Sequence, residues 1–268
     1  LKQLCTSMKT ISAKFNISFP KSAALEEPMP VVRQAAGKDA PAGAQQADPG
    51  GVIPKAAKIA GFSAKSMSVL DVLAPHNSDA DRVVVLGLGK AGKLSTHDWL
   101  RAGGVAAANF KKASKVVIYA DAPGVDVDGE AASGIALGLL LRAYSFDAYK
   151  TKKKSDDEKT PKTVEITIVT TAHDAAEKAF KTAQAVADGV NLARELVNLP
   201  PNVLGPEEFA DKAVELQKLG VEVEILGEKE MKKLGMGALL GVAQGSVRPP
   251  RLAVMQWKGG SKKDEPIA

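Results

Sequence analysis

The spacing of apolar positions changes repeatedly along the chain, and each change marks a predicted element. Strict alternation over Ser12–Phe19 predicts a strand. Continuous apolar runs at 81–88 and 115–120 are typical of strands in a sheet that is covered on both faces. Further strands are expected at 30–34, 67–73, 163–170, 221–226 and 252–257, and helices at 52–60, 95–112, 130–144, 173–197, 206–219 and 228–234.

A long helix divides the pattern into two parts. Between His173 and Val197 apolar residues recur at helical spacing and form one face. After Leu199 the alternation of helix and strand starts again, with Pro206 expected in a first helical turn and Gly220 closing that helix. This order predicts an N-terminal α/β domain with a mixed sheet at 8–172, a connecting helix at 173–198, and the first part of a second α/β domain at 199–268.

Local signals refine this outline. Ser95 and Asp98 have the spacing of a capping box, which predicts a helix start at this point. The segment 37–51 is rich in Gly, Ala, Pro and Asp and is expected to be an exposed loop, while 150–162 is expected to be a charged connector.

Composition places the chain among ordinary globular proteins. It has 268 residues, a net charge of +5 and a single cysteine, Cys5, so that no intrachain disulfide can form. No apolar run approaches the roughly 18 residues that span a bilayer. We therefore predict a cytoplasmic protein with no membrane segment, with Met8 as the expected natural start.

A glycine-rich turn at Gly87–Gly92 fits a dinucleotide fingerprint, because it follows a strand, precedes a helix, and is followed by an acid, Asp121, after the next strand. The helix cap at Ser95 nevertheless leaves extra loop between the glycines and the helix. The same turn fails as a triphosphate loop, because Leu94 stands where a hydroxyl residue should bind magnesium. A tight turn after a buried strand is the favoured interpretation, and a nicotinamide-binding site is the alternative.

Other polar groups show no arrangement that would bind a metal. The three histidines are isolated from one another, and one alternating acidic run lacks the ligand spacing of a calcium loop. We expect a turn or a helix start at each histidine and a solvated turn at the acids. These residues are His76, His97 and His173, and Asp126, Asp128 and Glu130.

Contact with nucleic acid has weak support in the sequence. The basic run Lys150–Lys154 is followed at once by acids, which favours a solvated connector. Basic and acidic residues are interspersed elsewhere, whereas dedicated nucleic-acid binders concentrate positive charge on one face. Cys5 has no activating partner in the sequence, so a thiol nucleophile is not expected.

The last third of the chain carries a specific succession of motifs. It runs from NLARELVNLPPN at 191–202 through LGMGALLGV at 234–242 and QGS at 244–246 to RPPRL at 248–252. This succession resembles the leucyl aminopeptidase family, also called cytosol aminopeptidases. The segments 84–90, 99–104 and 116–121 are similar, more loosely, to the N-terminal domain of that family.

The resemblance implies a metal-dependent aminopeptidase that removes N-terminal residues, leucine among them, from peptides. It implies two divalent metal ions, manganese or zinc, that activate a water molecule, and a hexamer of subunits. The family's metal-binding motifs are expected to begin just beyond Ala268. No residue of this chain is therefore assigned a catalytic, cofactor-binding or metal-binding role, and the chain alone is expected to be inactive.

Scaffold roles are predicted for the matched residues. Pro200 and Pro201 stop the long helix. The glycines at 235, 237 and 241 are expected to allow close backbone packing, and Arg248 is expected to fix the entry to the last strand. Two other hypotheses stay open, namely a module for DNA contact or assembly and an NAD-dependent oxidoreductase.

Overall fold

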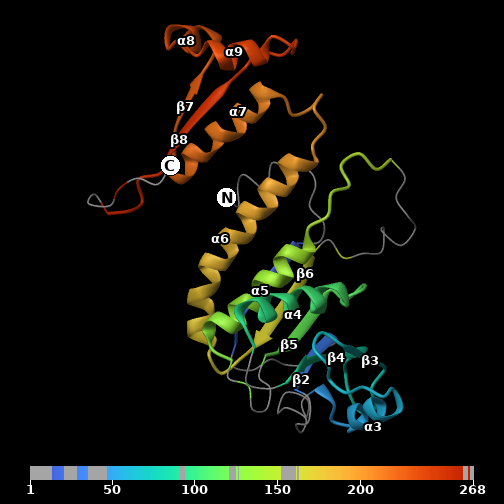
Figure 1. The fold of residues 1–268 in the computed structure, drawn as a ribbon. Helices are drawn as coiled ribbons and strands as arrows, with labels where there is room; N and C mark the ends of the chain where they lie inside the picture. Colours follow the sequence, from blue (N-terminus) through green and yellow to red (C-terminus); the bar gives the residue numbers. More distant parts are fainter. Residues whose placement is uncertain are drawn as a thin grey trace. The chain divides into compact units, whose positions relative to one another are not determined.

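The computed structural model describes residues 14–20, 29–35, 47–90, 94–120, 125, 127–151, 161, 163–261 and 265, with the backbone alone described at 29–35 (Figure 1). These residues fall into two compact units, one within 8–191 and one within 192–268. The division lies inside the long helix α6 (His173–Asn198).

Within the described residues, the first unit is built on a sheet of six strands in the order β1-β6-β5-β2-β4-β3. Every neighbouring pair is parallel except β3 and β4, which are antiparallel, so the predicted α/β class with a mixed sheet is confirmed. The strands are β1 (Lys14–Ser18), β2 (Met29–Ala35), β3 (Val69–Leu73), β4 (Arg82–Gly89), β5 (Lys115–Tyr119) and β6 (Thr163–Val169).

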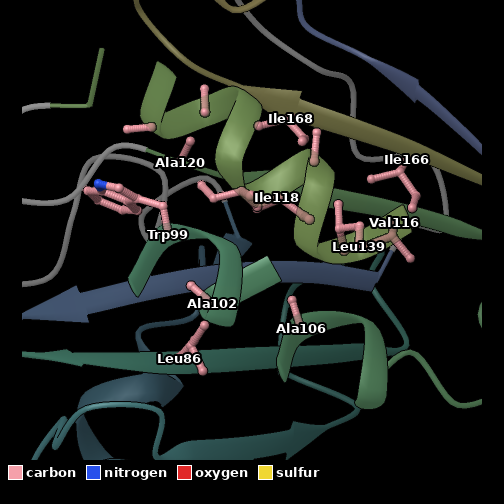
Figure 2. Close-up of a cluster of buried hydrophobic side chains, with 14 of the residues drawn as sticks. Leu86, Trp99, Ala102, Ala106, Val116, Ile118, Ala120, Leu139, Ile166 and Ile168 are labelled. Carbon is pink, nitrogen blue, oxygen red and sulfur yellow. The ribbon is translucent and has the colours of Figure 1, made fainter. Parts of the chain in front are cut away.

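Two helices, α4 (Thr96–Ala108) and α5 (Gly129–Ala143), cover one face of this sheet (Figure 1). Alternate residues of the central strands, such as Leu86, Ile118 and Ile168, pack beneath them with Trp99 and Leu139 (Figure 2). Since strands and helices contribute side chains that are almost fully buried, this cluster is the main core of the unit.

The opposite face is covered near β3 by a short helix, α3 (Val52–Ile59). Ile53 packs there against Val83 and Val85, the residues of β4 that point away from α4 and α5. The apolar run of β4 is therefore buried on both faces, as its sequence predicts.

The end of the predicted loop 37–51 differs from expectation, while residues 36–46 lie outside the described residues. Ala47 and Asp48 are buried rather than exposed. The Asp48 carboxylate accepts hydrogen bonds from the backbone N–H groups of Val52 and Ile53, at 2.8 and 2.7 Å. Its burial is explained by this role, because it pairs N–H groups that the first turn of α3 cannot pair itself.

Helices α4 and α5 approach each other through glycines. A Cβ atom added at Gly138 would lie 1.9 Å from the carbonyl oxygen of Leu100, and one at Gly103 would lie 2.0 Å from that of Ile135. No side chain fits at either position, so the two glycines allow the helices to pack backbone against backbone.

An ion pair joins the edge of the sheet to the end of α4. Arg82 binds Asp71 through Nε and Nη2, each at 2.6 Å, and its Nη1 donates to the carbonyl oxygen of Asn109 at 2.5 Å. Asn109 caps the C-terminus of α4, so the helix ends four residues before the predicted Lys112. One guanidinium group thus links β3, β4 and α4.

The second unit contains a two-stranded antiparallel sheet of β7 (Glu222–Leu226) and β8 (Leu252–Gln256). Around it lie α7 (Pro206–Glu215), the 3-10 turn η2 (Leu216–Leu219), α8 (Glu228–Lys233) and α9 (Gly237–Ala243). The predicted helix 206–219 is therefore regular only to Glu215, and Gly220 closes it with φ of 88°. Helix α9 was not predicted from the sequence.

Candidate functional site

The two described glycines of the predicted turn, Gly87 and Gly89, lie at the end of β4, and their backbone groups are hydrogen-bonded within the chain. The backbone N–H of Gly87 donates to the carbonyl oxygen of Ser68, and that of Gly89 donates to the carbonyl oxygen of Ala64, at 2.8 and 2.9 Å. The carbonyl oxygen of Gly87 in turn accepts from Met67 at 2.8 Å. These bonds extend the sheet edge into the segment 64–68.

This packing explains the glycines without a ligand. A Cβ atom at Gly87 would lie 2.4 Å from the carbonyl oxygen of Lys65, and Gly89 has φ of 77°, which favours glycine. A pyrophosphate needs free N–H groups at the helix entrance, and the amides of Gly87 and Gly89 are already bonded. The bonded amides of Gly87 and Gly89 therefore argue against a nicotinamide site at these two glycines. Gly92, Lys93 and Asp121 lie outside the described residues.

The histidines lie where the sequence places them. His76 is in a turn, His97 is in the first turn of α4, and His173 begins α6, where its Nδ1 lies 2.8 Å from Asp174. Within the described part of the chain, no group of three or more His, Cys, Asp or Glu side chains is placed to hold a metal ion.

The acidic and basic runs of the first unit are in part structural. Asp128, expected in a solvated turn, caps α5, since its carboxylate accepts from the N–H of Ala131 at 2.8 Å. Glu130 follows in the first turn of that helix. Asp126, Cys5 and most of the run Lys150–Lys154 lie outside the described residues. No helix in the described ranges is both long and apolar enough to cross a membrane.

The matched segment of the second unit is organised by Arg248. Its guanidinium donates to both carboxylate oxygens of Glu208, at 3.1 Å each, and to the carbonyl oxygen of Pro201 at 3.2 Å. Glu208 also accepts from the N–H of Gly205 at 2.9 Å, which caps the start of α7. One arginine therefore holds the entry to β8 against residues some forty positions earlier, as predicted in outline.

The fit around this arginine is tight. A Cβ atom at Gly205 would lie 1.7 Å from Nη1 of Arg248, so a side chain there would displace the guanidinium. A second arginine, Arg251, bonds the neighbouring carboxylate of Glu207 and the carbonyl oxygen of Pro250. We call these two pairs, Arg248–Glu208 and Arg251–Glu207, the α7 clamp.

The contacts of the α7 clamp change the pKa of Glu208. Hydrogen bonds from its own backbone N–H and from that of Gly205, together with the positive charge of Arg248, lower the pKa of Glu208 below its ordinary value. A bidentate pair between charged planar groups also fixes orientation. The α7 clamp thus sets how residues 248–251 enter β8, although it holds no reactive centre.

The glycines of the matched segment differ from the prediction. Gly235 has φ of 72°, which explains its presence. Within the described residues, nothing lies within 4 Å of a Cβ atom built at Gly235, Gly237 or Gly241. The prediction that these three glycines allow close backbone packing is therefore wrong as far as the described residues are concerned.

Models of one family match both parts of the chain. The N-terminal domain of the cytosol aminopeptidase family matches residues 31–153, and its catalytic domain matches residues 191–268. The matched ranges account for most of the chain and follow each other in order.

Curated relatives extend this result. A probable cytosol aminopeptidase of Agrobacterium fabrum is 73% identical over 259 residues, which are 96% of this chain and 52% of the relative. One from Rhizobium etli is 62% identical over 258 residues, which are again 96% of this chain and 52% of the relative. The chain thus spans about half the length of these relatives.

Solved structures share the fold. A mutant of tomato leucine aminopeptidase matches 95% of this chain and 54% of its own, with a TM-score of 0.77 and 23% identity. The bottromycin maturation enzyme BotP in complex with Mn matches 87% of this chain and 45% of its own, with a TM-score of 0.65 and 23% identity.

Proposed function

Because the chain belongs to the cytosol aminopeptidase family, we propose that the protein to which it contributes removes N-terminal residues, leucine among them, from peptides. The observation that carries this proposal is the match of residues 191–268 to the catalytic domain of the family. That match includes the clamp residues Arg248 and Glu208, which hold the start of β8.

We propose that the metals expected for the family are bound by residues outside the described ones. Two divalent ions, manganese or zinc, would supply the Lewis-acid chemistry that activates water for attack on a peptide bond. The described residues offer no cluster of ligands and so do not fit such a centre, and no step of catalysis is assigned to them. Manganese is favoured for a first trial because the similar BotP structure was solved in complex with Mn.

The proposed assembly and location rest on the resemblance to the family. We propose a hexamer in the cytoplasm, acting on peptides. Weak contact with DNA is the second candidate, and its support is the net charge of +5, with the basic run Lys150–Lys154 as its strongest local feature. Polyanion binding of this kind would fall steeply with added salt.

Hydrolysis of leucine p-nitroanilide tests the proposal. A protein with the full length of the relatives should release nitroaniline when manganese or zinc is added, and a chelator should abolish the activity. The matched substrate control is N-acetyl-leucine p-nitroanilide, which lacks the free amino terminus and should not be cleaved. Absence of cleavage with every divalent metal tried would contradict the proposal.

A second arm tests where the metal ligands lie. Residues 1–268 alone, checked by intact mass, should be inactive under the same conditions. Activity in that chain would refute our placement of the catalytic residues. Calorimetric titration with NAD(H) should show no binding, and saturable binding would revive the oxidoreductase hypothesis.

A further inference from the structure

One asparagine of the chain differs from the others in the residue that follows it. Asn77 precedes Ser78, which is small. An asparagine side chain can cyclise onto the backbone nitrogen of the next residue, and a bulky or β-branched next side chain hinders that approach. The other asparagines precede Ile, Phe, Leu, Leu and Val, and they are Asn16, Asn109, Asn191, Asn198 and Asn202. Asn77 therefore has the least hindered neighbour.

Both groups that would react at Asn77 are available. The Asn77 side chain is exposed and forms no hydrogen bond with any part of the chain that the structure describes. By contrast, the side-chain amides of Asn16, Asn109 and Asn198 donate hydrogen bonds of 2.7, 2.8 and 2.8 Å. The backbone nitrogen of Ser78 likewise donates no hydrogen bond among the described residues, so neither reacting group is held by another partner.

The backbone at Asn77 lies outside regular structure. This residue is in the turn between β3 and β4 and has φ of 56°, a left-handed conformation that asparagine adopts more readily than most residues. Ring closure requires rotation about the backbone of Asn77. The pairing of β3 with β4 ends at Leu73 and Arg82, so it does not hold the turn, and local opening permits the rotation.

We propose that Asn77 is a site of spontaneous deamidation. The backbone nitrogen of Ser78 loses its proton and attacks Cγ of Asn77, the side-chain nitrogen leaves as ammonia, and a cyclic succinimide forms. Water then opens the ring at either carbonyl, which yields aspartate or isoaspartate. The net reaction takes up one water molecule and releases one ammonia molecule, and no group is oxidised or reduced.

The turn packs on the segment that begins α3, so the isoaspartate product would disturb that helix. A Cβ atom at Gly50 would lie 2.2 Å from the carbonyl oxygen of His76, which shows how closely the two backbones approach. Ser78 Oγ donates to the carbonyl oxygen of Ala47 at 3.5 Å and accepts from the N–H of Ala80 at 3.3 Å. Isoaspartate inserts an extra carbon into the backbone immediately before Ser78, so these contacts would shift.

Peptide mapping by mass spectrometry tests the reaction in a protein of full length that is aged in mildly alkaline buffer. The mass gain from replacing NH2 by OH should occur at Asn77 before it occurs at any other asparagine of residues 1–268. Ser78→Thr keeps the hydroxyl group but adds a branch at Cβ, so it should slow the gain several-fold, and Ser78→Gly should accelerate it. The proposal is overturned by equal rates in the three proteins, or by no gain at Asn77 while a denatured sample deamidates there.

Hydrogen exchange measures the structural consequence separately. The backbone N–H groups of Val52 and Ile53, which bond to Asp48, should exchange faster in the fraction that an isoaspartate-specific methyltransferase labels. Asn77→Asp supplies the charge without the extra backbone carbon and should leave this exchange as slow as in fresh protein. Unchanged protection in the labelled fraction would refute the coupling of the turn to α3. Neither measurement depends on peptidase activity, so the aminopeptidase assay can succeed where this proposal fails.

Discussion

The glycine contact between α4 and α5 gives the sharpest test of the first unit, through the substitution Gly138→Ala. The added Cβ would lie 1.9 Å from the carbonyl oxygen of Leu100 and 2.9 Å from the backbone nitrogen of Gly104. Ordinary contacts between carbon and oxygen are about 3.3 Å or longer. The helices would therefore have to separate by about 1.4 Å at this point.

Two effects of opposite sign compete. Alanine favours the helix by about 1 kcal/mol relative to glycine. Overpacking of a filled core costs about 1–3 kcal/mol, and sometimes more. The obstacle here is backbone on a neighbouring helix and not the end of a flexible side chain, so the upper figure applies. We expect a net loss of about 2 kcal/mol, which corresponds to a midpoint lower by about 4–8 °C in a unit of this size.

Fluorescence during thermal unfolding provides the measurement. In a Trp257→Phe background, the buried Trp99 alone reports on this core, because the chain has two tryptophans. The matched control is Gly189→Ala on α6, where nothing lies within 4 Å of the new Cβ. That variant should gain about 1 kcal/mol. If Gly138→Ala is as stable as the control, the backbone contact between the helices does not exist as described.

Two further predictions concern charged groups. Arg82→Leu should lower the free energy of unfolding by about 1–3 kcal/mol, because it leaves both Asp71 and the carbonyl of Asn109 unpaired. Asp71→Asn should cost about 1 kcal/mol or less. Equal losses in urea titrations would contradict the contribution of the bond to Asn109. The pKa values of Asp98 and Glu208 are lowered in the folded protein, so their ionised carboxylates stabilise the fold at any pH above the ordinary carboxylate pKa of roughly 4. This stabilisation is lost as the pH falls through the lowered pKa values. Glu208→Gln should therefore flatten the acid side of the pH–stability curve, and an unchanged slope would refute the role of the α7 clamp.

Periodicity was sufficient to predict most elements of the fold. The strands β4 and β5 and the long helix α6 follow directly from apolar spacing. The capping box also held, with Ser95 Oγ accepting from the N–H of Asp98 at 3.3 Å and Asp98 accepting from the N–H of Ser95 at 2.9 Å. These features depend on residues that are close together in the sequence, so they can be predicted from the sequence alone.

Helix α9 escaped prediction for a physical reason. Its sequence, GALLGVA, is apolar throughout, so no polar face reveals a helical period, and its glycines favour turns. The neighbouring glycines were then interpreted as close-packing positions, although no described residue approaches them.

The sequence around Gly87 and Gly89 could not by itself exclude a nucleotide-binding loop, because the residues that bond these glycines lie elsewhere in the chain. The backbone groups of Gly87 and Gly89 form hydrogen bonds with residues 64–68, and the glycine motif itself gives no signal of this pairing. The α7 clamp is equally non-local, because Arg248 and Glu208 are separated by 40 positions. Sequence could propose that Arg248 orders the start of β8, but the partner that does so was visible only in the structure.

The α7 clamp is better understood as a device for orientation than as a source of stability. Its side chains are partly exposed, at 35% for Arg248 and 43% for Glu208, and exposed ion pairs contribute little to stability. A bidentate arginine with a third bond to the carbonyl of Pro201 nevertheless fixes direction as well as distance. Since β7 and β8 form only two strands, the path of the chain into β8 has little else among the described residues to define it. A clamp of small energy can therefore still set the direction in which residues 248–251 enter β8.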